Sequence, residues 1–330
     1  MIDARLPLAL GEGGPLLPSG GRVAVFRPQV DASLSALEGF QVEIIEGFRP
    51  AFDAWTTRGM ACAVESEGIY DASVVCLPRA RAEAHAMIAD AVRMTKGPVL
   101  IDGQKTDGAD SILRAARRRT EVTGPFIRAH GKLFVMPDAD PGDFADWQAG
   151  PALTEGGFWT APGVFSADAV DPASALLAQA LPERLGRTVV DLGAGWGFLS
   201  AHVLTRDTVE QVHLVEAGHM ALECARHNVT DPRAAFYWAD ATRWQAPGPC
   251  DTVVMNPPFH TGRDADPALG QAFVASAARL LASNGHLWMV ANRHLRYEAT
   301  LQKFFSKVTE VGGDNRFKLF QATRPLRRRR

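Results

Sequence analysis

Two short phrases in this sequence of 330 residues carry the residue types that could do chemistry. The first runs from Val189 to Gly197 and holds an acid, Asp191, followed by three glycines at alternate positions. The second runs from Asn256 to Phe259 and has two prolines at its centre. Glycine lets the backbone approach a ligand closely, and proline cannot continue a strand ladder because it donates no N–H. The two phrases therefore predict a cofactor-binding turn and a rigid loop that holds a substrate.

The spacing of the glycines indicates which kind of cofactor fits the turn. A dinucleotide-binding turn has the pattern G-x-G-x-x-G, whereas here the third glycine, Gly197, comes one position early and Phe198 follows it. The negative charge of Asp191 would repel a pyrophosphate and attract a cationic sulfonium amino acid. Hydride chemistry with a dinucleotide is therefore the weaker interpretation.

Together the two phrases resemble a known class of enzyme. Asp191-x-Gly193-x-Gly195-x-Gly197 followed by Asn256-Pro257-Pro258-Phe259 is similar to the class I S-adenosylmethionine-dependent methyltransferases that modify exocyclic amino groups. This resemblance implies S-adenosyl-L-methionine as the cofactor.

The second half of the chain alternates strands and helices in the way an open α/β sheet requires. The expected strands are 188–192, 211–215, 235–238, 252–255, 286–290, 308–311 and 317–323, the last two as an antiparallel hairpin. The expected helices are 172–181, 197–204, 217–229 and 267–284. Sites in such sheets lie at the carboxyl ends of the strands, so both phrases belong to one edge.

Acids at the ends of the next two strands extend the predicted cofactor site. Glu216 lies about 20 residues beyond the glycines, where an acid binds both ribose hydroxyls, although it could also be a surface carboxylate. Asp240 could accept from the adenine amino group, with the Ala241 N–H facing the ring, or it could cap a helix. The full set of predicted cofactor-binding residues is Phe165, Asp191, Gly193, Ala194, Gly195, Gly197, Glu216, Ala217, Asp240, Ala241 and Asn256.

Further motifs narrow the resemblance to one family. They are Gly163-Val164-Phe165-Ser166, Asn256-Pro257-Pro258-Phe259-His260, Val290-Ala291-Asn292 with Tyr297, and Arg316-Phe317-Lys318. Together they resemble the bacterial ribosomal RNA guanine-N2 methyltransferases of the RsmC type, which have two tandem methyltransferase-like domains with only the second active. In that family the segment containing Phe165 closes over the cofactor; from residue type alone it could equally be a hydrophobic staple for the following helix.

The resemblance assigns catalysis to Asn256, Pro257, Pro258 and Phe259. Guanine N2 is a poor nucleophile because its lone pair is delocalised into the ring. The Asn256 side-chain oxygen and the Pro257 carbonyl could each accept one N–H and so turn the lone pair toward the methyl group. Phe259 could stack on a base flipped out of its helix, or it could simply fill core.

The first half of the chain has similar alternation without the chemistry. The expected strands are 22–26, 42–45, 72–77 and 98–101, with helices near 33–37 and at 80–94. No glycine turn follows the first strand, and Pro78-Arg79 stands where an Asn-Pro-Pro loop is needed. Pro78-Arg79-x-Arg81-x-Glu83-Ala84 and His130-Gly131-Lys132-Leu133 resemble the inactive half of the same family.

The predicted organisation is therefore two tandem Rossmann-like methyltransferase domains of the α/β class, the first degenerate and the second a seven-stranded class I sheet. Residues 1–137 form the degenerate domain, which positions RNA, 138–157 a linker, and 158–330 the catalytic domain with a basic tail, Arg327 to Arg330. Arg114, Arg117, Arg118, Arg119, Arg128 and Lys132 form a basic cluster in the first half. That cluster is either a solvated helix face or an RNA phosphate contact.

Composition limits the other possibilities. A content of 46% hydrophobic and 22% charged residues is typical of a globular protein. Because no long apolar run occurs and the segment from Met1 to Leu10 is short and carries Asp3 and Arg5, we expect neither a membrane span nor a signal peptide. The four cysteines and nine histidines lack ligand spacing, so no metal is expected. A net charge of −2 argues against indiscriminate binding to nucleic acid. We expect a cytoplasmic monomer whose partner is ribosomal RNA or a ribosomal subunit, with no membrane association.

Two other hypotheses remain open at the level of sequence. Asn-Pro-Pro sites serve any amino group conjugated to a π-system, so protein glutamine or DNA adenine is an alternative substrate; a phenylalanine at Phe259 and the duplicated first half weigh against it. A non-catalytic RNA-binding assembly factor with a vestigial pocket is the other alternative.

Overall fold

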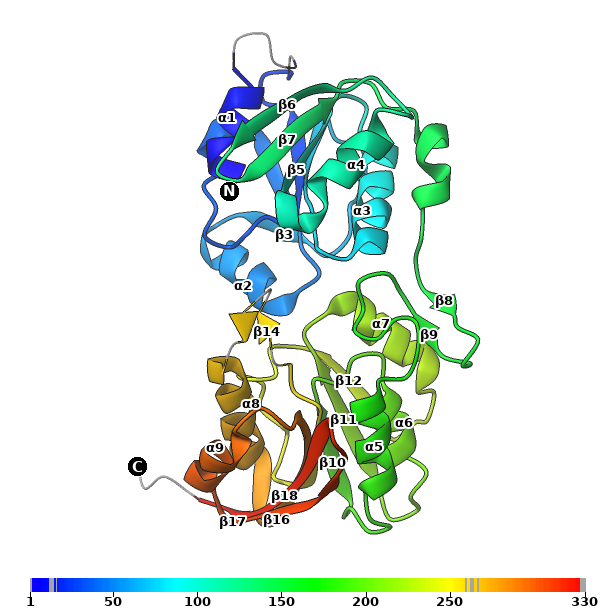
Figure 1. The fold of residues 1–330 in the computed structure, drawn as a ribbon, viewed down its shortest axis with the longest axis vertical. Helices are drawn as coiled ribbons and strands as arrows, with labels where there is room; N and C mark the ends of the chain where they lie inside the picture. Colours follow the sequence, from blue (N-terminus) through cyan, green and yellow to red (C-terminus); the bar gives the residue numbers. More distant parts are fainter. Residues whose placement is uncertain are drawn as a thin grey trace. The chain divides into compact units, whose positions relative to one another are not determined.

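The fold was analysed in a computed structural model that describes residues 2–11, 15, 17–258, 260–261, 264–265 and 267–326. The chain divides into two compact units, Met1–Gly150 and Pro151–Arg330 (Figure 1). Across the described ranges, no helix is both long and apolar enough to span a membrane.

The first unit is built on one seven-stranded sheet with the order β3-β2-β1-β4-β5-β7-β6. Its strands are β1 (Arg22–Phe26), β2 (Gln41–Ile45), β3 (Ala61–Ala63), β4 (Ala72–Cys76), β5 (Val99–Gln104), β6 (Thr123–Arg128) and β7 (Gly131–Met136). Its helices are α1 (Leu6–Ala9), α2 (Arg49–Thr57), α3 (Arg81–Arg93), α4 (Ala109–Ala116) and the 3₁₀ segments η1 (Ile2–Ala4), η2 (Ser35–Leu37), η3 (Lys105–Asp107) and η4 (Pro141–Trp147). Strands β1 to β5 run parallel, whereas β7 is antiparallel to both β5 and β6.

The second unit repeats this plan with the order β12-β11-β10-β13-β16-β18-β17. The strands of its main sheet are β10 (Thr188–Leu192), β11 (Gln211–Glu216), β12 (Ala234–Trp238), β13 (Cys250–Met255), β16 (Leu281–Asn292), β17 (Phe305–Gly313) and β18 (Phe317–Pro325). Its helices are α5 (Pro172–Ala180), α6 (Phe198–Val203), α7 (His219–Asn228), α8 (Pro267–Leu280) and α9 (Tyr297–Phe304). Two short pairs complete it: β8 (Ala152–Leu153) with β9 (Trp159–Thr160), and β14 (His260–Thr261) with β15 (Asp264–Ala265).

The order and sense of the strands agree in the two sheets, position for position. In both units the first strand lies beside the second and the fourth, and the last two strands form an antiparallel pair at the edge. The prediction of two tandem Rossmann-like α/β domains is therefore confirmed.

The central strands form because they are short, β-branched and buried on both faces. In β10, every residue after Thr188 is buried, and its alternate side chains enter different cores. Val190 and Leu192 belong to the core under α8 and α9, and Val189 to the core under α5 and α6. This double burial holds β10 in register, since a slip of one residue would exchange the two faces.

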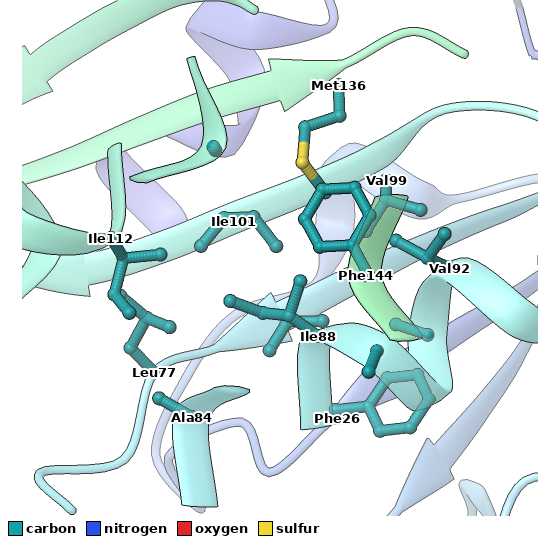
Figure 2. Packing of buried hydrophobic residues seen from close by; sticks show 14 of the residues in the cluster. Phe26, Leu77, Ala84, Ile88, Val92, Val99, Ile101, Ile112, Met136 and Phe144 are labelled. Carbon is teal, nitrogen blue, oxygen red and sulfur yellow. The ribbon is translucent and has the colours of Figure 1, made fainter. Parts of the chain in front are cut away.

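The first unit has an equivalent core between its sheet and helices α3 and α4. Phe26, Ile88, Val99 and Phe144 are among the side chains that meet there (Figure 2). Phe144 comes from η4, within the stretch 138–157 that was predicted to be a linker.

That prediction is wrong for the first part of the stretch. Phe144 and Trp147 are 0% and 5% exposed, and Trp147 stacks on His85 of α3 with ring centroids 3.9 Å apart. A segment that buries two aromatic side chains belongs to the folded unit rather than to a solvated connection. The division of the chain accordingly falls after Gly150.

Several predicted elements also change length or type. The helix near 33–37 is only the 3₁₀ turn η2, and the helix expected to reach Asn284 ends at Leu280. It ends there because Leu281 is already aligned with Cys250 of β13, so the chain has joined the sheet. Strand β17 is longer at both ends than expected, and β18 begins at Phe317 as expected but extends to Pro325.

Candidate active site

The glycine turn lies between β10 and α6, as predicted. Gly193, Gly195 and Gly197 all have positive φ angles, of 82°, 55° and 89°. The requirement is strictest at Gly197, where an added Cβ would lie 2.9 Å from Cγ2 of Val229 just after α7. Glycine at this position lets the start of α6 pack closely against the end of α7.

Asp191 is completely buried beneath this turn. Its Oδ2 accepts a hydrogen bond of 2.7 Å from the Ser200 hydroxyl on α6, whereas its Oδ1 is buried without a partner. Burial raises the pKa of Asp191 to about 7. The residue does not line the pocket described below, although Gly193, two positions on, does. A buried carboxylate with one unsatisfied oxygen is costly, and such groups cluster at functional sites.

Glu216, at the end of β11, ties the turn to the neighbouring strand. One carboxylate oxygen accepts the Gly195 N–H at 2.8 Å and the other accepts the Gly218 N–H at 2.7 Å. Burial raises the pKa of Glu216, although these backbone hydrogen bonds oppose the shift. Each oxygen keeps capacity for one further donor, which suits a pair of ribose hydroxyls.

The residues after β12 have mainly local partners. Asp240 accepts at Oδ1 from both the backbone N–H and the hydroxyl of Thr242, at 2.8 and 2.6 Å, so it caps the turn that follows β12 rather than a helix. Ala217 accepts from the indole N–H of Trp238 through its carbonyl at 2.8 Å. Ala241 is buried, and its carbonyl accepts from the Ser276 hydroxyl.

Asn256 follows β13 directly, and its amide is fixed by two partners that were not predicted from the sequence. Its Nδ2 donates to Oδ2 of Asp171 and to Oγ of Ser174, both at 2.9 Å. Of the prolines that follow, Pro257 is buried and Pro258 is exposed. Phe259 lies outside the described residues.

A pocket brings the two phrases together. It has about 400 Å³ of space, including its mouth, which opens to solvent. It is lined by Phe165, Ser166, Asp171, Ser174, Gly193, Ala194, Gly195, Trp196, Phe198, Leu199 and Asn256. Five of the predicted cofactor residues thus share one cavity: Phe165, Gly193, Ala194, Gly195 and Asn256. The other six are not among its lining residues: Asp191, Gly197, Glu216, Ala217, Asp240 and Ala241.

Trp196, within the glycine turn, fastens the segment that contains Phe165. Its indole N–H donates to the Phe165 carbonyl at 3.1 Å, while Phe165 as a residue is 63% exposed. Asn228 of α7 links the glycine turn to β9, because its Nδ2 donates at 2.8 Å to the carbonyls of both Trp159 and Trp196. Trp196 is therefore a structural link between the glycine turn and the segment that contains Phe165.

The corresponding place in the first unit is closed. Arg27 stands where Gly193 does, since its N–H donates to Ile45 at 3.0 Å just as that of Gly193 donates to Val215 at 2.9 Å. Arg27 even keeps a positive φ of 49°, but its side chain forms an ion pair with Glu83. The Arg27 side chain thus occupies the position at which a cofactor-binding turn has a glycine with no side chain.

The loop after β4 has lost the amide as well. Because Val75 aligns with Phe26, the residue level with Asn256 is Cys76, followed by Leu77 and Pro78. The degenerate site therefore keeps a proline at the third position of the loop and lacks the amide at the first.

The basic cluster of the first unit is only partly available to a ligand. Arg119 pairs with Asp146 at 2.5 Å, and Lys132 pairs with Asp110. Arg114, Arg117, Arg118 and Arg128 are exposed. Helix α4 ends at Ala116, so the arginines after it lie in a turn rather than on the helix face expected from their spacing.

Comparison with known proteins places the chain in a class. A family model, the methyltransferase small domain, matches residues 155–321, which include the whole candidate site. The chain belongs to this family. Among the residues described, no group of three or more His, Cys, Asp or Glu side chains could hold a metal ion.

Particular relatives cover much more of the chain. Ribosomal RNA small subunit methyltransferase C of Hahella chejuensis is 28% identical over 327 residues, which is 92% of this chain and 94% of the relative. A solved structure of the T. thermophilus 16S rRNA N2 G1207 methyltransferase (RsmC), in complex with AdoMet and guanosine, has a TM-score of 0.79 at 28% identity and covers 94% of this chain and 89% of its own. Ribosomal RNA large subunit methyltransferase G of Aeromonas salmonicida is 33% identical, but over only 48% of this chain and 44% of its own.

Proposed function

We propose that this protein transfers a methyl group from S-adenosyl-L-methionine to the exocyclic N2 amine of a guanine in small-subunit ribosomal RNA. The observation that carries the proposal is the pocket in which the glycine turn and the Asn256 amide meet. The similarity to a guanine-N2 methyltransferase extends over both units, whereas the relative that acts on the large subunit matches only about half of the chain. This extent favours the small subunit.

The residues in and directly beneath the pocket fit the cofactor. The buried carboxyl group of Asp191 lies under the glycine turn, where its charge favours a cation held at the turn, and the Glu216 carboxylate, which accepts the Gly195 N–H of the turn, has capacity for ribose hydroxyls. We assign the amino-acid end of the cofactor to Asp191, Gly193, Ala194, Gly195, Gly197 and Phe165, the ribose to Glu216 and Ala217, and the adenine to Asp240 and Ala241. Because Oδ1 of Asp240 is held by Thr242, the adenine amino group is assigned to Oδ2, which lies 3.7 Å from Nε of the exposed Arg243.

When bound, the cofactor supplies a sulfonium methyl group: the N–C bond forms as the C–S bond breaks with its electron pair on sulfur, and the amine then loses one proton. The work of the protein is alignment and acceptance of hydrogen bonds. The Oδ1 of Asn256 and the carbonyl of Pro257 each accept one N–H of the amine, so its lone pair points out of the guanine plane. Pro257 and Pro258 hold that carbonyl rigidly because their φ angles are fixed. In this proposal Phe259 stacks on the base.

The two units divide the work. The second unit, with the Arg327 to Arg330 tail, performs methyl transfer, and the first positions the RNA through exposed arginines. Residues 151–157 of the predicted linker belong to the second unit, where β8 pairs with β9. We further propose that the protein is a monomer that acts in the cytoplasm and that its partner is ribosomal RNA or a ribosomal subunit.

A direct assay tests this function. Purified protein is incubated with small ribosomal subunits, or with naked small-subunit RNA, and S-adenosylmethionine carrying a labelled methyl group. The RNA is then digested to nucleosides. Label in N2-methylguanosine supports the proposal. Label in methyladenosine, or in the protein fraction, favours methylation of another conjugated amine, and cofactor binding without any transfer favours an assembly factor.

Cofactor affinity should depend on pH through Asp191. Its pKa of about 7 means that the carboxyl is mostly protonated at pH 6 and becomes ionised as the pH rises through 7. Only the ionised form attracts an ammonium group, so affinity should rise from pH 6 to about 7.5 and fall above about 8, where an α-amino group loses its proton. Calorimetric titrations across this range measure the profile. Asp191→Asn should remove the rise, and a rise that persists in this variant would contradict the assignment.

The exposed arginines of the first unit should act through RNA phosphates. Replacing Arg114, Arg117 and Arg118 together with glutamine should raise the apparent KM for RNA and reduce the salt dependence of log KM by about one unit of slope per lost phosphate contact. Cofactor affinity should not change. Arg93→Gln is the control, since this exposed arginine of α3 is paired with Asp90. An unchanged salt slope in the triple variant would remove these residues from the interface.

A further inference from the structure

We infer that Asp171 and Ser174 are positioning residues for Asn256, and that they determine which atom of its amide faces the substrate. The inference rests on the proposed function, because it concerns the amide that accepts the amine. Neither residue was singled out by the sequence. Asp171 is the N-cap of α5 and Ser174 lies on its first turn, whereas Asn256 follows β13, 85 residues after Asp171.

The hydrogen bonds fix the orientation of the amide. An asparagine side chain has two N–H donors and one acceptor oxygen. Both N–H groups of Asn256 are used, one by the Asp171 carboxylate and one by the Ser174 hydroxyl oxygen. Turning the amide over would set its oxygen against the carboxylate. The Oδ1 therefore points the other way and has no donor among the residues that the structure describes.

The two acceptors are themselves rigid. Oδ2 of Asp171 also accepts the Ser174 backbone N–H at 2.8 Å, so this oxygen both caps α5 and binds Asn256. Helix α5 is anchored by Leu177 and Ala178, which are 0% and 3% exposed in the core of the second unit. The start of a packed helix thus holds the end of a central strand, and this preorganises the acceptor before the substrate arrives.

This orientation matters for the reaction. An amide with its oxygen toward the pocket accepts from an amine, whereas the opposite orientation would present donors and favour a carbonyl. The attacking nitrogen gains positive charge as the methyl group is transferred. The negative charge of Asp171, next to Nδ2, polarises the amide so that Oδ1 becomes a stronger acceptor for that nitrogen. The contact should therefore matter more in the transition state than in binding.

Three variants separate this role from helix capping. Ser174→Ala removes one contact to Asn256 and keeps the cap, because the capped donor is the backbone N–H. Asp171→Ala removes the other contact and the cap together. Asp171→Asn keeps an oxygen that can accept from both donors and loses only the charge. The rate of methyl transfer in a single turnover, at saturating cofactor, is measured for each, together with the cofactor Kd and the Tm.

We expect Ser174→Ala to slow transfer by roughly 10-fold and Asp171→Ala by roughly 10- to 100-fold, as for the loss of a neutral and a charge-assisted hydrogen bond. Asp171→Asn should recover the part of the loss that comes from the hydrogen bonds but not the part that comes from the charge, so its rate should lie between those of Asp171→Ala and the wild type. In an Asn256→Ala background neither alanine substitution should slow transfer further, because the group that they position is gone. A role in capping or in cofactor binding would instead give losses that add.

The outcomes separate this inference from the proposed function. If the wild-type protein methylates guanine N2 and Asn256→Ala does not, but Ser174→Ala and Asp171→Ala match the wild type, only the positioning role is wrong. Losses that persist in the Asn256→Ala background also overturn it. If Asp171→Ala fails to fold, Ser174→Ala decides. If the wild-type protein transfers no methyl group to guanine, the proposed function fails and this inference with it.

Discussion

Replacing Asn256 with alanine is expected to lower methyl transfer by about two to three orders of magnitude, the usual effect of removing one preorganised polar group at a reacting centre. The loss should appear in single-turnover rates with saturating cofactor and RNA. The physical reason is that Oδ1, held by Asp171 and Ser174, is the acceptor that turns the amine lone pair toward the methyl group.

Cofactor binding should be nearly normal in this variant, because the ligand keeps its contacts with the glycine turn and Glu216. Asn315→Ala, at an exposed asparagine of the same unit, is the matched control and should behave like the wild type. A single-turnover rate within a few-fold of the wild type for Asn256→Ala would reduce this residue to a turn former.

Replacing Asp191 or Glu216 with alanine should weaken cofactor binding by about 1.5–3 kcal/mol each, or roughly 10- to 150-fold in Kd. Asp191→Ala removes the buried charge beneath the turn. Glu216→Ala removes the ribose acceptor and also releases the Gly195 N–H, which shapes the turn. Isothermal titration calorimetry gives both constants.

Glu210→Ala provides the control for these two variants. Glu210 precedes β11 at the opposite end of that strand from Glu216 and forms an exposed ion pair with Arg187. It should bind cofactor like the wild type. Wild-type isotherms for both Asp191→Ala and Glu216→Ala would reject the assignment of the cofactor site.

The tandem α/β fold could be predicted because its central strands are short, apolar and separated by regular helices, so their burial is visible in local sequence. A helix carrying Arg114 was expected from the spacing of the arginines, but the bounds of α4 and the β6–β7 hairpin were not predicted. The eight residues of α4 follow a glycine with no side-chain cap, and Gly124 and Pro125 interrupt β6. Their stability comes from packing, as with Ile112 and Phe134 in the core of the first unit, and such long-range packing has no local pattern.

In the candidate site, the residues at strand ends could be predicted from the sequence, whereas their partners far away in the chain could not. Asp191, Glu216 and Asn256 each lie within one residue of the carboxyl end of a parallel strand, so topology alone predicted that they lie along one edge. Asp171 and Ser174 were missed because an aspartate before a proline is an ordinary helix start, and nothing nearby relates it to a loop 85 residues on. The hydrogen bonds from Thr242 to Asp240 were also not predictable, since a carboxylate after a strand can either cap the next turn or bind a ligand.

The most direct test of the central claim is the ribosomal RNA of cells that lack this protein. Digestion to nucleosides and mass spectrometry, with fragment mapping of the small-subunit RNA, should show that one N2-methylguanosine is missing. The wild-type gene should restore it, and the Asn256→Ala gene should not. Small-subunit RNA with its full set of N2-methylguanosines in the deletion strain would contradict the account.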